Sequence, residues 1–232
     1  MLVGILQPSY LPWLGFFEQM AKVDVFVLYD DVQYDRRGWR NRNRIKNSQR
    51  VQWLSVPVMT KGKRAQLINQ TRIDSATKWK LKHLTSLELN YKKAIYFNHF
   101  YCQIEPLLNK KWNYLLDLNL NLLNLLKEYL GIKTQVILSS SLLKKLPRDA
   151  SPESRLIEIC EKLGGDTLYE GAAGKNYIDA NLFKKSHIGL VYQQYRHPVY
   201  NQLYGDFIPY LSVVDLIFNE GPKSLSVLKL NR

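Results

Sequence analysis

The first 29 residues of the chain change their hydrophobic period twice. Residues 3–6 and 25–29 are short apolar runs, so both are expected to be buried strands. Between them, residues 7–12 contain two prolines, which predict a turn, and residues 13–23 carry apolar side chains at helical spacing. Strand, turn, helix and strand in this order form a βαβ unit, which favours a parallel sheet. An α/β fold is therefore predicted.

Later segments continue this pattern of strands and helices. Further strands are predicted at residues 51–58, 135–138, 167–170 and 189–193, and helices at 76–130 (with breaks near 90 and 109), 151–163 and 212–219. A chain of 232 residues is long enough for one large domain. We predict a Rossmann-like, largely parallel sheet in a single α/β domain spanning residues 1–232, with 76–131 as a mainly helical insertion.

The composition fits a cytoplasmic protein without membrane insertion. The chain holds two cysteines, Cys102 and Cys160, both among apolar or aromatic neighbours, so no disulfide framework is expected. No stretch approaches the ~20 apolar residues of a membrane span, because polar residues such as Asp117 and Asn121 interrupt the leucine-rich segment. The apolar run at the N-terminus is also shorter than the core of a signal peptide.

Positive charge is concentrated in one part of the chain. The formal net charge is +13, and residues 36–82 contain 14 lysines and arginines but a single acid, Asp74. Such a block repels itself unless an anion neutralises it. Its first arginines are interleaved with aromatic and amide side chains, and a guanidinium fork suits phosphate or carboxylate. We predict a site for a phosphate-bearing ligand here; a basic face exposed to solvent is the alternative.

The turn after the first strand is a second candidate site. Gln7 ends that strand, and Asp30 and Asp31 follow the second strand, so all three should emerge at one edge of a parallel sheet. Ligands bind beyond this edge, next to helix N-termini. Gly15 would allow the backbone to approach a ligand closely. The alternative is a rigid proline turn with Trp13 in the core.

Two side chains are candidates for proton transfer. Asp31 lies at a strand end, where a carboxylate can accept a proton, bind a metal or bond sugar hydroxyls. Either Asp30 or Asp31 could instead pair with Arg36 or Arg40. His197 lies in the polar run HPVYNQ, just after a predicted strand, and its unperturbed pKa near 6.5 suits a general base. A structural histidine is the alternative, and no metal site is assigned.

Several stretches together resemble the WbqC-like family of bacterial proteins. They are QPSYLPWLGFF (7–17), DVFVLYDDVQYDRRGWRNRNRIK (24–46), WLSVPV (53–58), LYEGAAGKNYID (168–179), HPVYNQ (197–202) and SVVDLIFNEGP (212–222). The resemblance covers essentially the whole chain. It implies a bacterial protein associated with surface polysaccharides such as the O-antigen of lipopolysaccharide. It further suggests a transferase that adds an acyl or aminoacyl group to the amine of a nucleotide-linked amino sugar.

On this hypothesis, Asp31 or His197 is catalytic and takes the proton from the attacking amine. The basic residues within 40–46 would hold the diphosphate, and Trp39 or Tyr10 would stack on a base or sugar. The expected substrate-binding residues are Gln7, Tyr10, Trp13, Gly15, Asp30, Gln33, Trp39, Arg40, Asn41, Arg42, Arg44, Lys46, Tyr200 and Gln202.

Two kinds of partner are expected on this hypothesis. One is a nucleotide sugar or another phosphate-bearing compound, and the other is an acyl or aminoacyl donor such as a charged tRNA; the cofactor is left open. Two alternatives remain. The chain could be an RNA-binding or tRNA-dependent protein that uses the basic segment 36–82. It could also be a non-enzymatic scaffold of a polysaccharide assembly complex.

Overall fold

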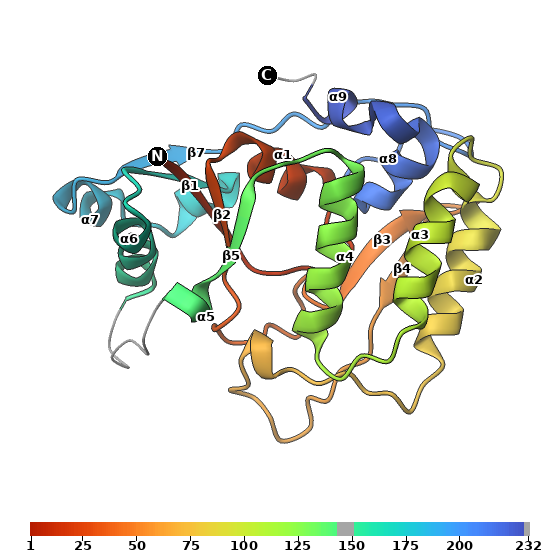
Figure 1. The fold of residues 1–232 in the computed structure, drawn as a ribbon, viewed down its shortest axis with the longest axis horizontal. Helices are drawn as coiled ribbons and strands as arrows, with labels where there is room; N and C mark the ends of the chain where they lie inside the picture. Colours follow the sequence, from red (N-terminus) through yellow and green to blue (C-terminus); the bar gives the residue numbers. More distant parts are fainter. Residues whose placement is uncertain (143–150, 230–232) are drawn as a thin grey trace.

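A five-stranded parallel sheet forms the centre of the computed structural model, which describes residues 1–142 and 151–229 (Figure 1). The strands are β1 (Leu2–Leu6), β2 (Val25–Leu28), β5 (Gln135–Leu138), β6 (Thr167–Glu170) and β7 (Gly189–Tyr192). Their order is β5-β2-β1-β6-β7, and each neighbouring pair runs parallel. With helices on both faces of this sheet, the predicted Rossmann-like α/β fold is confirmed.

Alternate side chains of the central strands pack against two layers of helices. Val3 and Val25 belong to a cluster that includes α6 (Pro152–Leu163) and α7 (Ala180–Lys185). Phe26 and Leu28 belong to a larger cluster that includes α1 (Leu14–Lys22), α8 (Val213–Glu220) and α9 (Ser224–Lys229). Because both faces are covered, all positions of β2 are buried, which explains its uninterrupted apolar sequence.

The segment predicted to be mainly helical contains three long helices. They are α2 (Trp79–Tyr91), α3 (Phe97–Asn109) and α4 (Leu115–Tyr129), with breaks close to the two predicted positions. Leu87, Phe100 and Leu122 are fully buried in the cluster that also holds α1 and α8. Helix α4 ends at Tyr129, and Gly131 follows two residues later with a φ of 69°, the left-handed conformation that glycine adopts without strain.

Residues 42–55 form a hairpin that is separate from the parallel sheet. Its strands β3 (Arg42–Lys46) and β4 (Val51–Ser55) are antiparallel. The strand predicted at 51–58 is therefore too long. It ends at Ser55, shortly before Pro57, which has no amide to donate, and it pairs with β3 rather than with the central sheet. The sequence does not predict β3, because its alternating arginines indicate a charged segment rather than a strand.

The remaining elements are short. They are α5 (Ser139–Leu142) and the 3-10 helices Ile68–Gln70, Ala172–Asn176 and Gly221–Lys223. In the two described ranges, every helix is too short or too polar to cross a membrane.

Candidate functional site

The strand order changes direction between β1 and β6. From β1 the sheet continues through β2 to β5 on one side, and through β6 to β7 on the other. In open parallel sheets, ligands bind beyond the carboxyl ends of the strands at such a switch point. The parallel register brings Gln7, Tyr29 and Glu170 to this edge, together with Asp30 and Asp31.

A cavity of about 410 Å³ lies at this switch point. Its polar walls are Gln7, Tyr29, Arg40, Glu170 and Tyr177. The apolar walls are Ile5, Leu6, Pro152 and Leu156. Pro152 is the first residue of the 12-residue helix α6, so the positive end of the helix dipole lies beside the cavity. We term this space the switch-point cavity. Its volume suits a small-molecule ligand.

Arg40 supplies a half-buried positive charge to the switch-point cavity. Its guanidinium donates a hydrogen bond to Oε1 of Gln7, and its buried Nε has no partner in the described chain. The backbone carbonyl of Arg40 accepts a 2.8 Å hydrogen bond from Nδ2 of Asn119 in α4. Burial lowers the pKa of Arg40 to about 10. A desolvated guanidinium with an unused N–H group is well suited to an anionic ligand.

Glu170 supplies a carboxyl group that titrates near neutral pH. It is 6% exposed, and burial raises its pKa to about 7, although hydrogen bonds with the Gly171 backbone and the Tyr177 side chain oppose the shift. The loop that follows is fitted closely to it, because a Cβ atom on Gly174 would lie 2.5 Å from Cγ of Glu170. A carboxyl of this kind can act as a general base at physiological pH.

Two further hollows continue from the cavity toward the hairpin. The first, of about 100 Å³, shares Leu6, Gln7 and Arg40 with the switch-point cavity. The second, of about 340 Å³, is lined by Trp13, Trp39, Arg44 and Tyr210, and we term it the aromatic slot. Trp13 and Trp39 line both of these hollows. The three hollows therefore follow one another through shared walls, from Glu170 to the slot.

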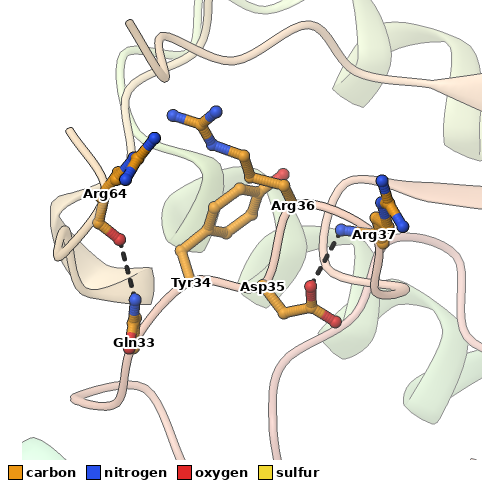
Figure 2. A pocket seen from close by; sticks show the side chains of 6 residues that line it. All are labelled: Gln33, Tyr34, Asp35, Arg36, Arg37 and Arg64. Atoms are coloured by element: carbon orange, nitrogen blue, oxygen red, sulfur yellow. Dashed lines mark hydrogen bonds between the residues drawn. The ribbon is translucent and has the colours of Figure 1, made fainter. Parts of the chain in front are cut away.

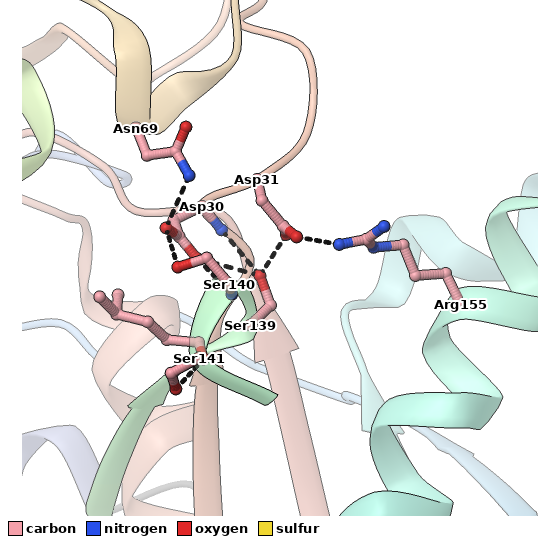
Figure 3. Close-up of polar contacts among 8 residues, drawn as sticks. Asp30, Asp31, Asn69, Ser139, Ser140, Ser141 and Arg155 are labelled. Atoms are coloured by element: carbon pink, nitrogen blue, oxygen red, sulfur yellow. Dashed lines mark hydrogen bonds and ion pairs between the residues drawn. The ribbon is translucent and has the colours of Figure 1, made fainter. Parts of the chain in front are cut away.

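The acidic pair after β2 is held by its neighbours (Figure 3). Asp30 is buried and accepts hydrogen bonds from Ser139, from the amide and hydroxyl of Ser140, and from Asn69. Asp31 accepts one from Ser139 at 2.5 Å and forms an ion pair with Arg155 of α6. The predicted alternative of a paired carboxylate is thus observed, with Arg155 in place of Arg36 or Arg40.

Both oxygens of Asp31 are engaged in these contacts, so the structure gives it a positioning role at the start of α6. In the described part of the chain, no group of three or more His, Cys, Asp or Glu residues is arranged to hold a metal ion. Hydrogen bonds from Ser139 and Ser140 and the ion pair with Arg155 therefore hold the carboxylates of Asp30 and Asp31 in place.

His197 lies apart from this edge of the sheet. It lines neither the switch-point cavity nor the two neighbouring hollows. Its Nδ1 lies 2.8 Å from the carbonyl oxygen of Pro198, and its ring packs among aromatic residues that include Tyr200 and Tyr210. Burial lowers the pKa of His197. The structure therefore does not bring His197 together with Gln7 and Asp31, contrary to what a shared catalytic site requires.

Three of the predicted substrate-binding residues meet in a buried network instead. Lys46 is 3% exposed, and its Nζ contacts Oε1 of Gln202 at 3.2 Å and the Asp206 carbonyl at 2.5 Å. Tyr200 and Gln202 each donate to the buried carboxylate of Asp215. This network joins β3 to the chain before α8. Its members have little access to a ligand.

Further predicted residues also have local structural roles. Tyr10 is fully buried, and its hydroxyl lies 2.8 Å from Nδ1 of His83. A Cβ on Gly15 would lie 2.2 Å from the Trp13 ring, so this glycine makes room for the indole rather than for a ligand. Asn41 donates to the Val56 carbonyl across the hairpin.

The exposed side of the hairpin carries the other predicted basic and aromatic residues. The guanidinium of Arg42 lies 4.8 Å from the ring centroid of Trp53. Trp39 and Trp53 stack with centroids 5.4 Å apart. Gln33 lies in a different hollow from Gln7, because its side chain donates to the Arg64 carbonyl.

Comparison with known proteins gives two matches. The model of the WbqC-like protein family matches residues 7–227. The chain belongs to this family. The family expected from the sequence stretches is therefore confirmed. A protein of Mycobacterium tuberculosis (strain ATCC 25618 / H37Rv), named uncharacterized protein Rv1507c, is 39% identical over 234 residues, which cover 99% of this chain and 98% of that protein. No solved structure matches the chain.

Sequence reasoning missed four residues of this WbqC-like site. Glu170, Tyr29 and Tyr177 line the switch-point cavity, and Arg155 pairs with Asp31. Glu170 could have been found, because it ends a predicted strand just as Gln7 does. The carboxyl ends of parallel strands lie at one edge of the sheet, so both residues are expected there. Tyr177 and Arg155 carry no such signal, since only the packing of their loop and helix against the sheet brings them near.

Proposed function

We propose that this WbqC-like protein is a transferase that adds an acyl or aminoacyl group to the amine of a nucleotide-linked amino sugar. The single observation that carries the proposal is that Glu170 and Arg40, a titratable carboxyl and a half-buried cation, line one cavity at the switch point of the sheet. Family membership supports the biological setting, the synthesis of surface polysaccharides such as the O-antigen of bacterial lipopolysaccharide.

The row of hollows suits the parts of a sugar nucleotide. In the proposed arrangement, the amino sugar occupies the switch-point cavity next to Glu170. The diphosphate lies at Arg40, where one N–H has no protein partner and the α6 N-terminus adds positive potential. The base enters the aromatic slot, where Trp13, Trp39 and Tyr210 offer stacking surfaces. Arg44, which also lines the slot, adds a second cation.

The proposed reaction needs a base close to the sugar amine. A protonated amine has no lone pair, so it must lose a proton before its nitrogen attacks the acyl carbon. That first proton leaves to water. In the proposed step the neutral amine attacks the acyl carbon, and Glu170 takes a second proton from the nitrogen as the new C–N bond forms. The bond between the acyl carbon and its leaving group then breaks, and Glu170 returns the proton to that group. Because its pKa is about 7, Glu170 can both accept and release the proton near neutral pH.

A panel of nucleotide sugars tests the proposal. UDP- and dTDP-linked amino hexoses are compared with their N-acetylated counterparts, which offer the same phosphates but no free amine. A ligand present at 100 times its Kd should stabilise the protein by about 2.7 kcal/mol. Incubation with candidate acyl thioesters or aminoacyl esters should then produce an amide, detected by mass spectrometry, from the free amines alone.

The variant Glu170→Gln separates binding from catalysis. It keeps the size and shape of the side chain, so the Kd for the amino sugar nucleotide should stay within a few-fold. Loss of the base should lower the transfer rate by about 10²–10⁴-fold. Two outcomes contradict the proposal: no stabilisation by any sugar nucleotide, or a Glu170→Gln variant that transfers at the wild-type rate.

A further inference from the structure

Another hollow, separate from the switch-point cavity and its two neighbouring hollows, is lined by three arginines. It measures about 520 Å³ and is lined by Gln33, Tyr34, Asp35, Arg36, Arg37 and Arg64. Figure 2 shows the guanidinium groups of Arg36 and Arg64 extending to the same side, beyond the ring of Tyr34. Nothing in the proposed transfer reaction uses this group of cations.

Backbone pairing between two distant segments brings these arginines together. The Tyr34 amide donates to the Gln66 carbonyl at 2.9 Å, and the Gln33 side chain donates to the Arg64 carbonyl at 2.8 Å. The Arg36 guanidinium donates to the Thr60 carbonyl. The fold thus holds like charges beside one another, which costs electrostatic free energy.

One carboxylate faces the three arginines of this cluster, so the cluster keeps a net positive charge. The ion pairs of the described residues join the N-terminus to Asp166, Lys22 to Glu18, and Arg155 to Asp31, so none involves residues 36–82. Asp35 is the one acid that lines the hollow, and it accepts a hydrogen bond from the amide of Arg37. The cluster therefore favours a ligand with several negative charges.

The cations continue along the hairpin and alternate with indole rings. The Arg42 guanidinium donates to the carbonyl of Arg37 and lies over Trp53. Trp53 stacks on Trp39, and the two are 45% and 42% exposed. We term this surface, made of Arg64, Arg36, Arg37, Arg42, Trp53 and Trp39, the arginine–tryptophan track.

We propose that the arginine–tryptophan track binds single-stranded RNA. Guanidinium groups that alternate with exposed indoles match a strand in which phosphates alternate with unstacked bases, because bases stack on aromatic rings and on guanidinium planes. A duplex keeps its bases inside and offers the indoles nothing to stack on. The choice of RNA rests on the proposed function, since an RNA 3′ end can carry the aminoacyl ester that an aminoacyl transfer consumes.

Fluorescence polarisation with a labelled 12-nucleotide RNA tests this inference. Neutralising four phosphates of a single strand predicts a slope of log affinity against log salt of about −3, so binding should weaken about 50-fold between 50 and 200 mM salt. A double-stranded RNA and a single-stranded DNA of the same sequence serve as competitors. Tighter binding of either one would overturn the proposal.

The double variant Arg37→Gln/Arg64→Gln should weaken RNA binding at least 10-fold and make the salt slope shallower by about 1.4. Trp53→Ala should weaken it roughly 5- to 100-fold, the range expected for the loss of one base–aromatic stack. Lys133→Gln and Leu81→Ala, which change exposed side chains outside the track, serve as matched controls. RNA binding that is unchanged in the track variants would overturn the inference.

The two proposals fail separately. Arg37→Gln/Arg64→Gln changes residues outside the switch-point cavity and the two hollows next to it, so it should keep wild-type affinity for the amino sugar nucleotide, whereas Arg40→Met should lose that affinity and keep RNA binding. If RNA binds but no sugar nucleotide does, the transferase proposal fails and the track remains. If anionic lipid vesicles bind and single-stranded RNA does not, the track is not an RNA site.

Discussion

The guanidinium group of Arg40 donates a hydrogen bond to Oε1 of Gln7, and this contact ties the loop before the hairpin to the end of β1. Both residues line the switch-point cavity and the small hollow that leads to the aromatic slot. The basic segment and the proline-rich turn therefore contribute to one site, although they are distant in sequence.

Replacing Arg40 with methionine should separate ligand binding from folding. The side chain keeps most of its volume but loses a desolvated charge, so the free energy of unfolding should change by no more than about 1 kcal/mol. Affinity for a sugar nucleotide should fall at least 10-fold, measured by calorimetry. Arg50→Ala, in the exposed hairpin turn, is the control. An equal loss of stability and binding would show that Arg40 is purely structural.

Glu170→Gln should change how stability depends on pH. The raised pKa of Glu170 means that the folded state favours the protonated carboxyl. The contribution of Glu170 to stability is therefore highest below about pH 4.5 and falls as the pH rises toward 7. Glutamine does not titrate. The variant should therefore gain stability relative to the wild type between pH 5 and pH 8, by up to about 3 kcal/mol in urea unfolding. Glu161→Gln, at an exposed site, should show no such gain.

Lys46→Met should destabilise the protein strongly. It removes the ammonium group near the buried carboxylate of Asp215, whose pKa burial already raises. It also removes the hydrogen bonds of that ammonium group to Gln202 and to the Asp206 carbonyl, and hydrogen bonds of a charged group contribute about 1.5–3 kcal/mol each, which together correspond to a fall in Tm of roughly 10 °C for a chain of this length. Adding Asp215→Asn should recover part of the loss. A double variant that is as unstable as the sum of the single variants would argue against this coupling.

Gly15→Ala should disturb the aromatic slot. The new Cβ would overlap the Trp13 ring, which must move out of its place in the slot wall. We expect a destabilisation of about 1–3 kcal/mol and weaker binding of nucleotides, followed by quenching of tryptophan fluorescence. Gly171→Ala is the matched control, because a Cβ there meets no atom within 4 Å. Equal effects at the two glycines would contradict the packing role of Gly15.

A double-mutant cycle with Asp31→Asn and Arg155→Gln should reveal a coupling of about 1–3 kcal/mol in urea unfolding. The reason is that the two partners form a largely buried ion pair between the end of β2 and the first turn of α6. If Asp31 positions α6 in this way, Asp31→Asn should reduce transfer far less than Glu170→Gln does. A rate loss as large as that of Glu170→Gln would restore Asp31 as the candidate base.

The sequence predicts the central sheet well, because its strands are buried on both faces and stand out as apolar runs. Because the carboxyl ends of parallel strands lie at one edge of the sheet, the sequence also places Gln7 at the same edge as Asp30 and Asp31. It does not predict β3, where half-buried arginines alternate with inward-facing Asn43 and Ile45 in a pattern that resembles a charged loop. The spacing of apolar residues reports only on positions close together along the chain. A strand such as β3 can be assigned only once its pairing with β4 is known.

Side-chain roles at the site were harder to infer than the fold. Lys46 and Arg44 have the same charge and lie on the same side of β3, yet one is buried beside Asp215 and the other lines the aromatic slot. His197 looked like a base because of its polar neighbours, but these neighbours bond to Asp215 and to one another. Long-range packing decides such roles, and composition gives no sign of it.

Asn119 in α4 holds the backbone of Arg40 through its side-chain amide. The long helical segment therefore also supports the switch-point cavity, because α4 braces a residue that lines it. Shortening this segment to obtain a minimal protein would remove the brace, so engineered versions need to retain α4 even where α2 and α3 are varied.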